Sequence, residues 1–156
     1  MFQSMKNKKR EVSREVIDEI LCRGEYGVLS TIGDHGYPCI TPLSYVYIND
    51  CIYFHCAIEG EKIDNIRRNN KVSFSVVNDT KVIQKKFTTD FKSVVIYGEG
   101  REIEGELKKE ALRALVKKYS PDFIASGERY IEKSEKDAKV VEIKIQHITG
   151  KVLEKQ

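Results

Sequence analysis

The stretch GVLSTIGDHGYPCITPLSYVYINDCIYFHC, residues 27–56, decides the fold of this chain. From residue 40 to residue 48, alternate positions form two sets that would face opposite sides of an extended chain, and turn-forming residues stand at Asn49–Asp50. Alternation with a period of two is typical of a β-strand, and such a pair suits a tight hairpin turn. We therefore predict three antiparallel strands, at residues 26–32, 37–48 and 51–56.

The rest of the chain adds strands and helices by the same kind of pattern. Period-two alternation predicts strands at residues 71–77, 93–104 and 139–149, and helical spacing predicts helices at residues 13–23, 62–69 and 106–119, with a weaker one at 122–137. The polar, basic stretch at residues 78–90 is predicted to be a mobile loop or a frayed hairpin. Six strands linked mainly by hairpins, with α-helices at the margins, predict a mainly β fold that closes into an antiparallel barrel.

The composition is that of one domain. The chain has 156 residues, of which 40% are hydrophobic and 33% charged, and its formal net charge is +3. A chain of this length buries enough apolar surface for one core without disulfides or a structural metal. We predict a single domain over residues 1–156, with a disordered basic N-terminus at residues 1–11.

The sequence predicts neither a membrane span nor a secretory signal. The longest run without Asp, Glu, Lys or Arg covers residues 37–49, which is too short and too polar to cross a bilayer. The basic N-terminus is not followed by the apolar core of a signal peptide. Acidic and basic residues alternate instead of forming a one-sided basic stripe. We therefore expect a cytoplasmic protein that binds neither membrane nor nucleic acid.

The four cysteines, Cys22, Cys39, Cys51 and Cys56, form no CxxC pair and no recognisable zinc-ligand set with the three histidines. We interpret them as reduced thiols in a cytosolic protein and expect no metal site. A cysteine nucleophile needs a base and a third orienting group, and the spacing supplies neither. His35 falls in a predicted turn, where we expect it to be solvated.

A glycine-containing loop links the third predicted strand to the start of a helix, in YFHCAIEGEK at residues 53–62. Free backbone N–H groups and the positive end of the helix dipole gather at such a helix start, and Lys62 adds a formal charge. This arrangement suits a phosphate group. The alternative is that Gly60 is only a turn residue and Lys62 a solvated lysine, and the residues alone leave both possibilities open.

His55 lies in the predicted strand that runs directly into this loop. On the period-two pattern it shares a face with Cys51 and Tyr53, where a neutral imidazole could hydrogen-bond to a ring-shaped ligand. The alternative is a half-buried structural histidine bonded to a backbone carbonyl.

A basic and aromatic stretch around Phe87 permits other interpretations. Its lysines could line a channel for an acidic ligand, or they could belong to a solvated loop. Together with tyrosines of the first strands, they would also suit a small barrel that stacks the bases of a single-stranded nucleic acid. The residues concerned are Lys81, Lys85, Lys86 and Lys92, with Tyr45, Tyr47 and Tyr53.

The chain resembles the FMN-binding split-barrel proteins related to pyridoxamine 5'-phosphate oxidase, and most closely their nitroimidazole-reductase-like branch, which is associated with nitroimidazole resistance. The resemblance covers residues 27–77 and continues through FKSVVIYGEGREIE (91–104), ELKKEALRALVKKY (106–119) and VVEIKIQHITGK (140–151). Its most specific pieces are YFHCAIEGEK and FKSVVIYG. The resemblance implies a six-stranded antiparallel split β-barrel with peripheral α-helices. It also implies a homodimer with FMN bound at the subunit interface.

The resemblance further implies which residues hold the FMN. The strand at residues 41–45 would pass along the isoalloxazine ring, which residues 54–56 would flank. Lys62 would take the 5'-phosphate, with Gly60 allowing the backbone to approach, and Ser93 would reach across the dimer. The cofactor-binding set is Thr41, Pro42, Leu43, Ser44, Tyr45, Phe54, His55, Cys56, Gly60, Lys62 and Ser93. Leu43, Tyr45 and Phe54 are interpreted as interface and flavin surface rather than interior.

The resemblance implies an FMN-dependent oxidoreductase that takes hydride from a reduced nicotinamide and reduces small electron-poor acceptors such as nitroimidazoles. His55 would be the catalytic residue that orients the acceptor or supplies a proton. Pyridoxamine phosphate oxidation is not expected, because residues 39–44 lack the Arg and Lys of the oxidases and Glu61 stands where they carry Arg. The alternative is a flavin- or haem-binding carrier or sensor without turnover, with His55 as a haem ligand.

Overall fold

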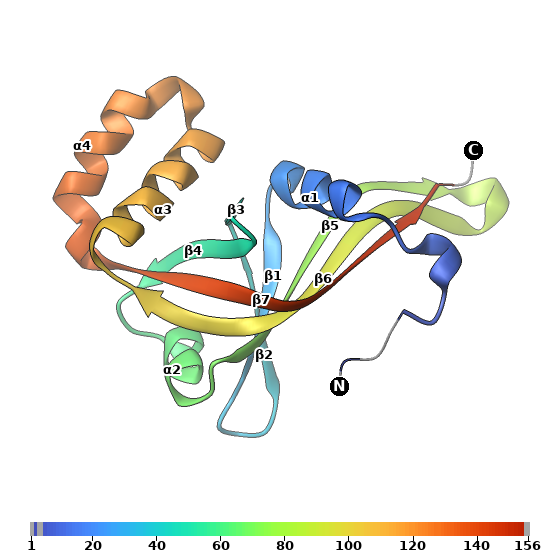
Figure 1. The fold of residues 1–156 in the computed structure, drawn as a ribbon, viewed down its shortest axis with the longest axis horizontal. Helices are drawn as coiled ribbons and strands as arrows, with labels where there is room; N and C mark the ends of the chain where they lie inside the picture. The colour runs from blue at the N-terminus through green and yellow to red at the C-terminus, as the bar shows by residue number, and fades with distance from the viewer. Residues whose placement is uncertain (1, 3–4, 155–156) are drawn as a thin grey trace.

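The computed structural model describes residues 2 and 5–154 (Figure 1). Within them, one antiparallel sheet has the strand order β2-β1-β5-β6-β7-β4-β3 and is accompanied by four α-helices, which confirms a mainly β, antiparallel fold. The strands are β1 (Gly27–Ile32), β2 (Pro38–Leu43), β3 (Val46–Ile48), β4 (Cys51–Ala57), β5 (Lys71–Ile83), β6 (Thr88–Ile103) and β7 (Ala138–Leu153). The helices are α1 (Arg14–Arg23), α2 (Glu61–Arg68), α3 (Gly105–Tyr119) and α4 (Ile124–Ser134).

The described sheet has seven strands rather than the predicted six, because the strand expected at residues 37–48 is broken. β2 pairs with β1 at one edge of the sheet and β3 pairs with β4 at the other, and only Ser44 and Tyr45 lie between them. Seven strands laid flat would place these edges about 29 Å apart, whereas the three peptide steps from Leu43 to Val46 span at most about 11 Å. The sheet is therefore strongly curled, and its two edges approach each other at Ser44–Tyr45.

The turn between β3 and β4 is the tight hairpin that the sequence predicts. Asn49 and Asp50 both have positive φ angles, 49° and 60°, and Ile48 pairs with Cys51 across the turn. Two consecutive residues of this kind form the turn whose twist matches that of the flanking strands.

At residues 78–90, where the sequence leaves a mobile loop or a frayed hairpin open, the structure has a hairpin. β5 and β6 remain paired as far as Ile83 and Thr88, with an irregularity after Asn78, and a short 3-10 helix at Gln84–Lys86 makes the turn. Figure 1 shows this hairpin projecting to the right of the molecule, away from α3 and α4. Most of its tip residues are exposed, so the sequence there lacks the apolar alternation by which a half-buried strand is recognised.

Two apolar clusters lie on opposite faces of the sheet where β4 pairs with β7. In β4, Ile52 and Phe54 enter the main core, which α1 covers, while Tyr53 belongs to a second cluster under α3. This is the alternation predicted for residues 51–56. The expectation that the side chains of Tyr45 and Phe54 form a surface is wrong, because both are fully buried (0% exposed) in the main core. The curl of the sheet turns them inward, and Leu43 also packs, partly buried, against that core.

The described part of the N-terminal segment has local structure where we expect disorder. Lys8–Arg10 form a 3-10 helix, and Glu11 makes an antiparallel bridge to Lys151 of β7. Residues 1, 3 and 4 of the same segment lie outside the described residues.

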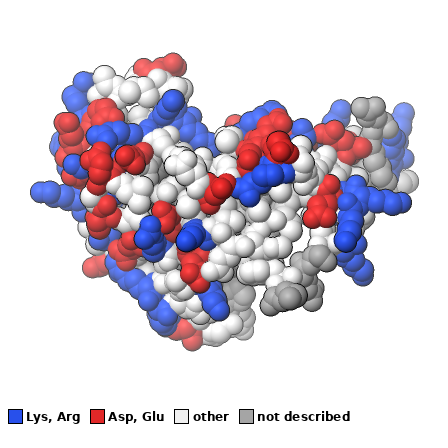
Figure 2. Space-filling model, in the orientation of Figure 1, with Lys and Arg blue, Asp and Glu red and all other residues white. Residues whose placement is uncertain are grey.

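The surface carries charges of both signs. Figure 2 shows Lys and Arg interspersed with Asp and Glu over the face in view. Tyr45 and Tyr53, on which a nucleic-acid binder would stack bases, are buried, so the stacking surface considered from the sequence does not form. Among the helices of residues 2 and 5–154, none has the length and apolar character that crossing a bilayer requires.

Glu142 of β7 links the stability of this fold to pH. Its buried carboxylate accepts hydrogen bonds from Arg101 Nε at 2.7 Å and from the Tyr53 hydroxyl at 2.9 Å. Burial raises the pKa of this carboxyl, but the two hydrogen bonds and the charge of Arg101 outweigh burial and leave the pKa below its ordinary value of 4.5. A carboxyl with a lowered folded-state pKa stabilises the fold above its unfolded pKa, and this contribution is lost as the pH falls through the folded pKa.

We therefore expect the free energy of unfolding to decrease from about pH 5 downward, and to decrease less steeply in the Glu142→Gln variant. Denaturant titrations at several acidic pH values measure both slopes, with Glu132→Gln, an exposed position on α4, as the control. Equal slopes in the wild type and in Glu142→Gln would contradict this role.

Candidate functional site

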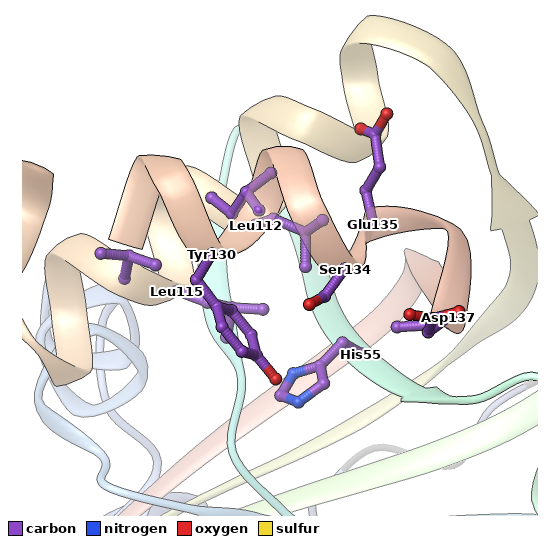
Figure 3. Close-up of a pocket in the computed structure, with 10 residues that line it drawn as sticks. His55, Leu112, Leu115, Tyr130, Ser134, Glu135 and Asp137 are labelled. Carbon is purple, nitrogen blue, oxygen red and sulfur yellow. The ribbon is translucent and has the colours of Figure 1, made fainter. Parts of the chain in front are cut away.

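His55 projects from the face of β4 that looks toward α3 and α4. It lines a cavity of about 190 Å³ together with Leu112 and Leu115 of α3 and Tyr130 and Ser134 of α4. Figure 3 shows the His55 ring and the hydroxyl end of Tyr130 pointing toward one another across this cavity. The site is therefore a histidine facing a largely apolar helical wall.

A second, more open cavity connects His55 to the break between β2 and β3. It has a volume of about 630 Å³, and its lining includes His55, Ser44, Tyr119 and Phe123. This volume lies within the range of small-molecule sites, roughly 300–1,000 Å³. We call the two cavities together the His55 cleft.

The imidazole of His55 is available to a ligand. The residue is exposed, and none of the described residues forms a hydrogen bond or an ion pair with its ring. Within residues 2 and 5–154, His55 is therefore not the half-buried histidine bonded to a backbone carbonyl that the sequence left open as an alternative. Leu115 and Tyr130 supply an apolar boundary on the opposite side of the cleft.

Helix α3 holds the β2–β3 break in place through its last two residues. The Tyr45 amide donates to the Tyr119 hydroxyl at 3.0 Å, and this hydroxyl donates to the Glu25 carbonyl at 2.7 Å. Lys118 Nζ donates to the Tyr45 carbonyl at 3.1 Å and lies 4.0 Å from the centre of the Tyr45 ring. Burial lowers the pKa of Lys118 to about 8. Both backbone polar groups of Tyr45 are thus satisfied by α3, and the position of Ser44 in the cleft is set by these contacts.

The loop after β4 has the form of an anion site. Gly60 has a φ angle of 139°, and a side chain added there would meet no atom within 4 Å. Its carbonyl accepts the amides of Ile63 and Asp64, both at 3.1 Å, and so begins α2. The preceding amides, those of Glu61 and Lys62, donate to no backbone carbonyl in the described chain. They lie at the positive end of the helix dipole.

Lys62 supplies a cation at this helix start. Within residues 2 and 5–154 it has no acidic partner. Burial raises the pKa of the Cys56 thiol, and the charge of Lys62 acts in the opposite direction. Glu61 does not compete for Lys62, because its carboxylate contacts His35 and Cys39 of the β1–β2 hairpin.

The structure brings some of the predicted site residues together and leaves others apart. Ser44 and His55 share the cleft, and Gly60 and Lys62 follow His55 within one short segment. Ser93 is remote from His55 along the sheet. On β6, Ser93 pairs with Lys151 of β7. His55 pairs with Val140 of β7, and Val140 pairs with Ile103 of β6. Ten residues separate Ser93 from Ile103, which is about 33 Å along a strand.

Sequence reasoning missed the helical wall and the residues that hold the break. The signals for the wall were the helical patterns at residues 106–119 and, more weakly, at 122–137, which predicted two helices but not what they face. Lys118 and Tyr119 follow the apolar pattern of α3 and carry no local sign of a contact with residue 45. Such contacts, 73 and 74 residues apart, depend on the tertiary fold.

Comparison with known families gives one match that covers most of the chain. The model of the family described as pyridoxamine 5'-phosphate oxidase matches residues 13–152. The search of curated proteins found no match.

Solved structures with the same fold are numerous, and three illustrate their range. A candidate 5-nitroimidazole antibiotic resistance protein from Bacteroides thetaiotaomicron has 23% sequence identity and a TM-score of 0.75, over 91% of this chain and 86% of that one. A conserved hypothetical protein from Mycobacterium tuberculosis has 18% identity and a TM-score of 0.84, over 98% and 96%. An FAD and heme binding protein from Mycobacterium smegmatis has 18% identity and a TM-score of 0.82, over 94% and 74%. At these levels of sequence identity, the similarity shows a shared fold only.

Proposed function

The chain belongs to the pyridoxamine 5'-phosphate oxidase family, a family of flavin-binding proteins, and we propose that it is an FMN-dependent oxidoreductase. The observation that carries this proposal is the order of two binding features along residues 55–62. A histidine without a protein partner faces an apolar cleft, and seven residues later an unpaired lysine stands at a helix start with free amides, in the described part of the chain. An anionic tail and a flat ring on one ligand would use both features.

The residues present fit FMN. Lys62 and the amides at the start of α2 would hold the phosphate, since the positive φ of Gly60 leaves the loop open to a close approach. β2 lies at an edge of the sheet, so some of its backbone N–H and C=O groups between Thr41 and Ser44 are free to meet the polar edge of the ring. When bound, the flavin supplies the hydride and electron-transfer chemistry.

The proposed reaction transfers reducing equivalents from a reduced nicotinamide to a small, flat, electron-poor acceptor such as a nitroimidazole. His55 would orient the acceptor or give it a proton, and the wall formed by Leu115 and Tyr130 would keep water from the ring. A fold relative is itself a candidate 5-nitroimidazole resistance protein, which supports this choice of acceptor. We place this chemistry in the cytoplasm, where the four free cysteines would stay reduced.

We also propose that the protein acts as a homodimer. The outer face of the sheet carries a row of uncharged side chains across four strands, from Ile40 through Ser30 and Ser73 to Tyr97. Ile40 is 70% exposed and Tyr97 42% exposed. By strand alternation Ser93 lies on the same face as Tyr97. A second copy covering this face would therefore bring its Ser93 to the interface, which would explain why Ser93 is far from His55 within one protomer.

We expect Ile40→Glu to weaken dimerisation by about tenfold or more, since it buries a charge in an apolar interface. Because Ile40 is exposed in the protomer, the fold itself should be unaffected. Analytical ultracentrifugation over a concentration series measures the effect, and Val82→Glu, at a similarly exposed valine on the β5–β6 hairpin, is the control. An Ile40→Glu protein that dimerises as the wild type does would exclude this face.

The second candidate function is a carrier or sensor without turnover. The observation that favours a haem-binding form of it is the imidazole of His55, which has no partner in the described part of the chain. Neutral imidazole is a common axial ligand of haem iron, and one fold relative binds both FAD and heme. A Soret band in the purified protein, lost in His55→Ala, would support this candidate.

The oxidoreductase is tested by steady-state assays of the FMN-loaded protein with NADH or NADPH and a nitroimidazole. The proposal expects oxidation of the nicotinamide that depends on protein, on FMN and on the acceptor. Tight FMN binding without such turnover would favour the carrier.

A further inference from the structure

The β1–β2 hairpin and the first residue of α2 place three metal-binding side chains together outside the His55 cleft. His35 lies in the hairpin turn, Cys39 in β2 and Glu61 at the start of α2, and one ligand atom from each lies within 4.8 Å of the other two. We propose that these three side chains form a binding site for a divalent transition-metal ion of the Zn²⁺ class.

The distances between the three ligand atoms are those of a tetrahedral centre. Cys39 Sγ lies 3.7 Å from His35 Nε2 and 3.2 Å from Glu61 Oε1, and His35 Nε2 lies 3.3 Å from the same Oε1. Zinc binds sulfur at about 2.3 Å and nitrogen or oxygen at about 2.0–2.1 Å, so tetrahedral geometry separates sulfur from nitrogen or oxygen by about 3.5 Å and nitrogen from oxygen by about 3.4 Å. Each of the three separations is within about 0.4 Å of that requirement.

The ligand types and charges also suit this class of metal. Thiolate, imidazole and carboxylate together favour Zn²⁺ or Co²⁺ over Mg²⁺ and Ca²⁺, which prefer oxygen ligands. A thiolate and a carboxylate neutralise a divalent ion, and three protein ligands leave a fourth position for water. Half-exposed His35 and Glu61 would leave that position open to solvent.

The surrounding residues hold the cluster together. A Cβ at Gly33 would stand 2.8 Å from Cys39 Sγ and 2.8 Å from His35 Cε1, so only glycine leaves room for this arrangement. The buried Asn65, on the second turn of α2, donates to the Thr31 hydroxyl of β1 at 3.1 Å and so fixes the start of α2, with Glu61, beside the β1–β2 hairpin.

Metal binding would replace the protons that now join the three groups. The Tyr37 amide donates to His35 Nδ1 at 3.2 Å, which puts the proton of a neutral ring on Nε2, beside Glu61. The Cys39 thiol also donates to Glu61. When the metal binds, the thiol loses its proton to solvent and the ring proton moves to Nδ1. The hydrogen bond from the Tyr37 amide to Nδ1 is then lost, because both nitrogens carry a proton. No electron is transferred in this step.

The experiment titrates the full-length, chelator-treated protein with Co²⁺ and records difference spectra against the same protein without metal. We expect one equivalent to bind with intense tetrahedral ligand-field bands and a thiolate-to-cobalt charge-transfer band, and Zn²⁺ to displace it. Cys39→Ser and His35→Gln should lose the charge-transfer band or weaken binding about tenfold or more. Cys22→Ser, at an exposed cysteine outside the cluster, should keep both.

Thermal unfolding separates loss of the site from loss of the fold. Zn²⁺ should raise the midpoint of the wild type and of Cys22→Ser, but not that of Cys39→Ser or His35→Gln, whose metal-free midpoints should match the wild type. Octahedral spectra, or an affinity for Zn²⁺ that Cys39→Ser and His35→Gln leave unchanged, would overturn the proposal.

Discussion

Replacing Lys62 with alanine is expected to weaken FMN binding by about tenfold or more. A charge-assisted hydrogen bond to phosphate contributes roughly 1.5–3 kcal/mol, and each 1.4 kcal/mol is a factor of ten in affinity. Lys62 has no acidic partner among residues 2 and 5–154, so its removal should cost the ligand contact without exposing an unpaired carboxylate. Fluorescence titration of the flavin with each protein measures the two dissociation constants.

Lys85→Ala is the matched control for Lys62→Ala. Lys85 is an exposed lysine at the turn of the β5–β6 hairpin, far along the sheet from α2. We expect it to bind FMN as the wild type does. A control that loses as much affinity as Lys62→Ala would indicate general electrostatic attraction, and unchanged affinity in Lys62→Ala would remove the phosphate assignment.

His55→Ala is expected to retain FMN and to lower turnover by about a hundredfold. A positioned acid or base commonly contributes 10²–10⁴ in rate, whereas the phosphate contacts that anchor the cofactor lie at α2. Stopped-flow reduction of the acceptor by the pre-reduced protein measures this step separately from reduction by the nicotinamide.

His55→Gln separates the two roles considered for the imidazole. Glutamine can orient an acceptor by hydrogen bonding but cannot act as a proton donor of suitable pKa. Recovery of the rate in this variant would assign an orienting role, and a rate as low as that of His55→Ala would assign proton supply. Wild-type turnover in His55→Ala would return His55 to a structural role.

Much of the fold could be predicted from the sequence because most strands have one buried face. β4 shows this best: its alternate residues enter two different clusters, and the pattern of residues 51–56 predicts that division. The tight turn at Asn49–Asp50 could be predicted because residues with positive φ are chemically distinctive. At the exposed end of the β5–β6 hairpin, the sequence could not decide between a loop and a hairpin, because neither face is buried there and the residues show no period.

The break at Ser44–Tyr45 could not be predicted for a different reason. The period-two alternation of side chains continues through these residues. The change of pairing partner from β1 to β4 is decided by α3, which begins more than sixty residues later in the sequence. The same limit applies to the candidate site. The loop with Gly60 and Lys62 is contiguous and could be recognised, whereas the cluster of His35, Cys39 and Glu61 joins two segments 22 residues apart and shows no metal-site spacing.

The central claim is that residues 55–62 hold FMN, and the visible absorption spectrum of the purified protein tests it most directly. The protein should carry a flavin spectrum after purification or acquire one on incubation with FMN and gel filtration. High-performance liquid chromatography of the released pigment should identify FMN at one per chain. A colourless protein that retains no FMN after this treatment, at a concentration where its fold is intact, would contradict the account.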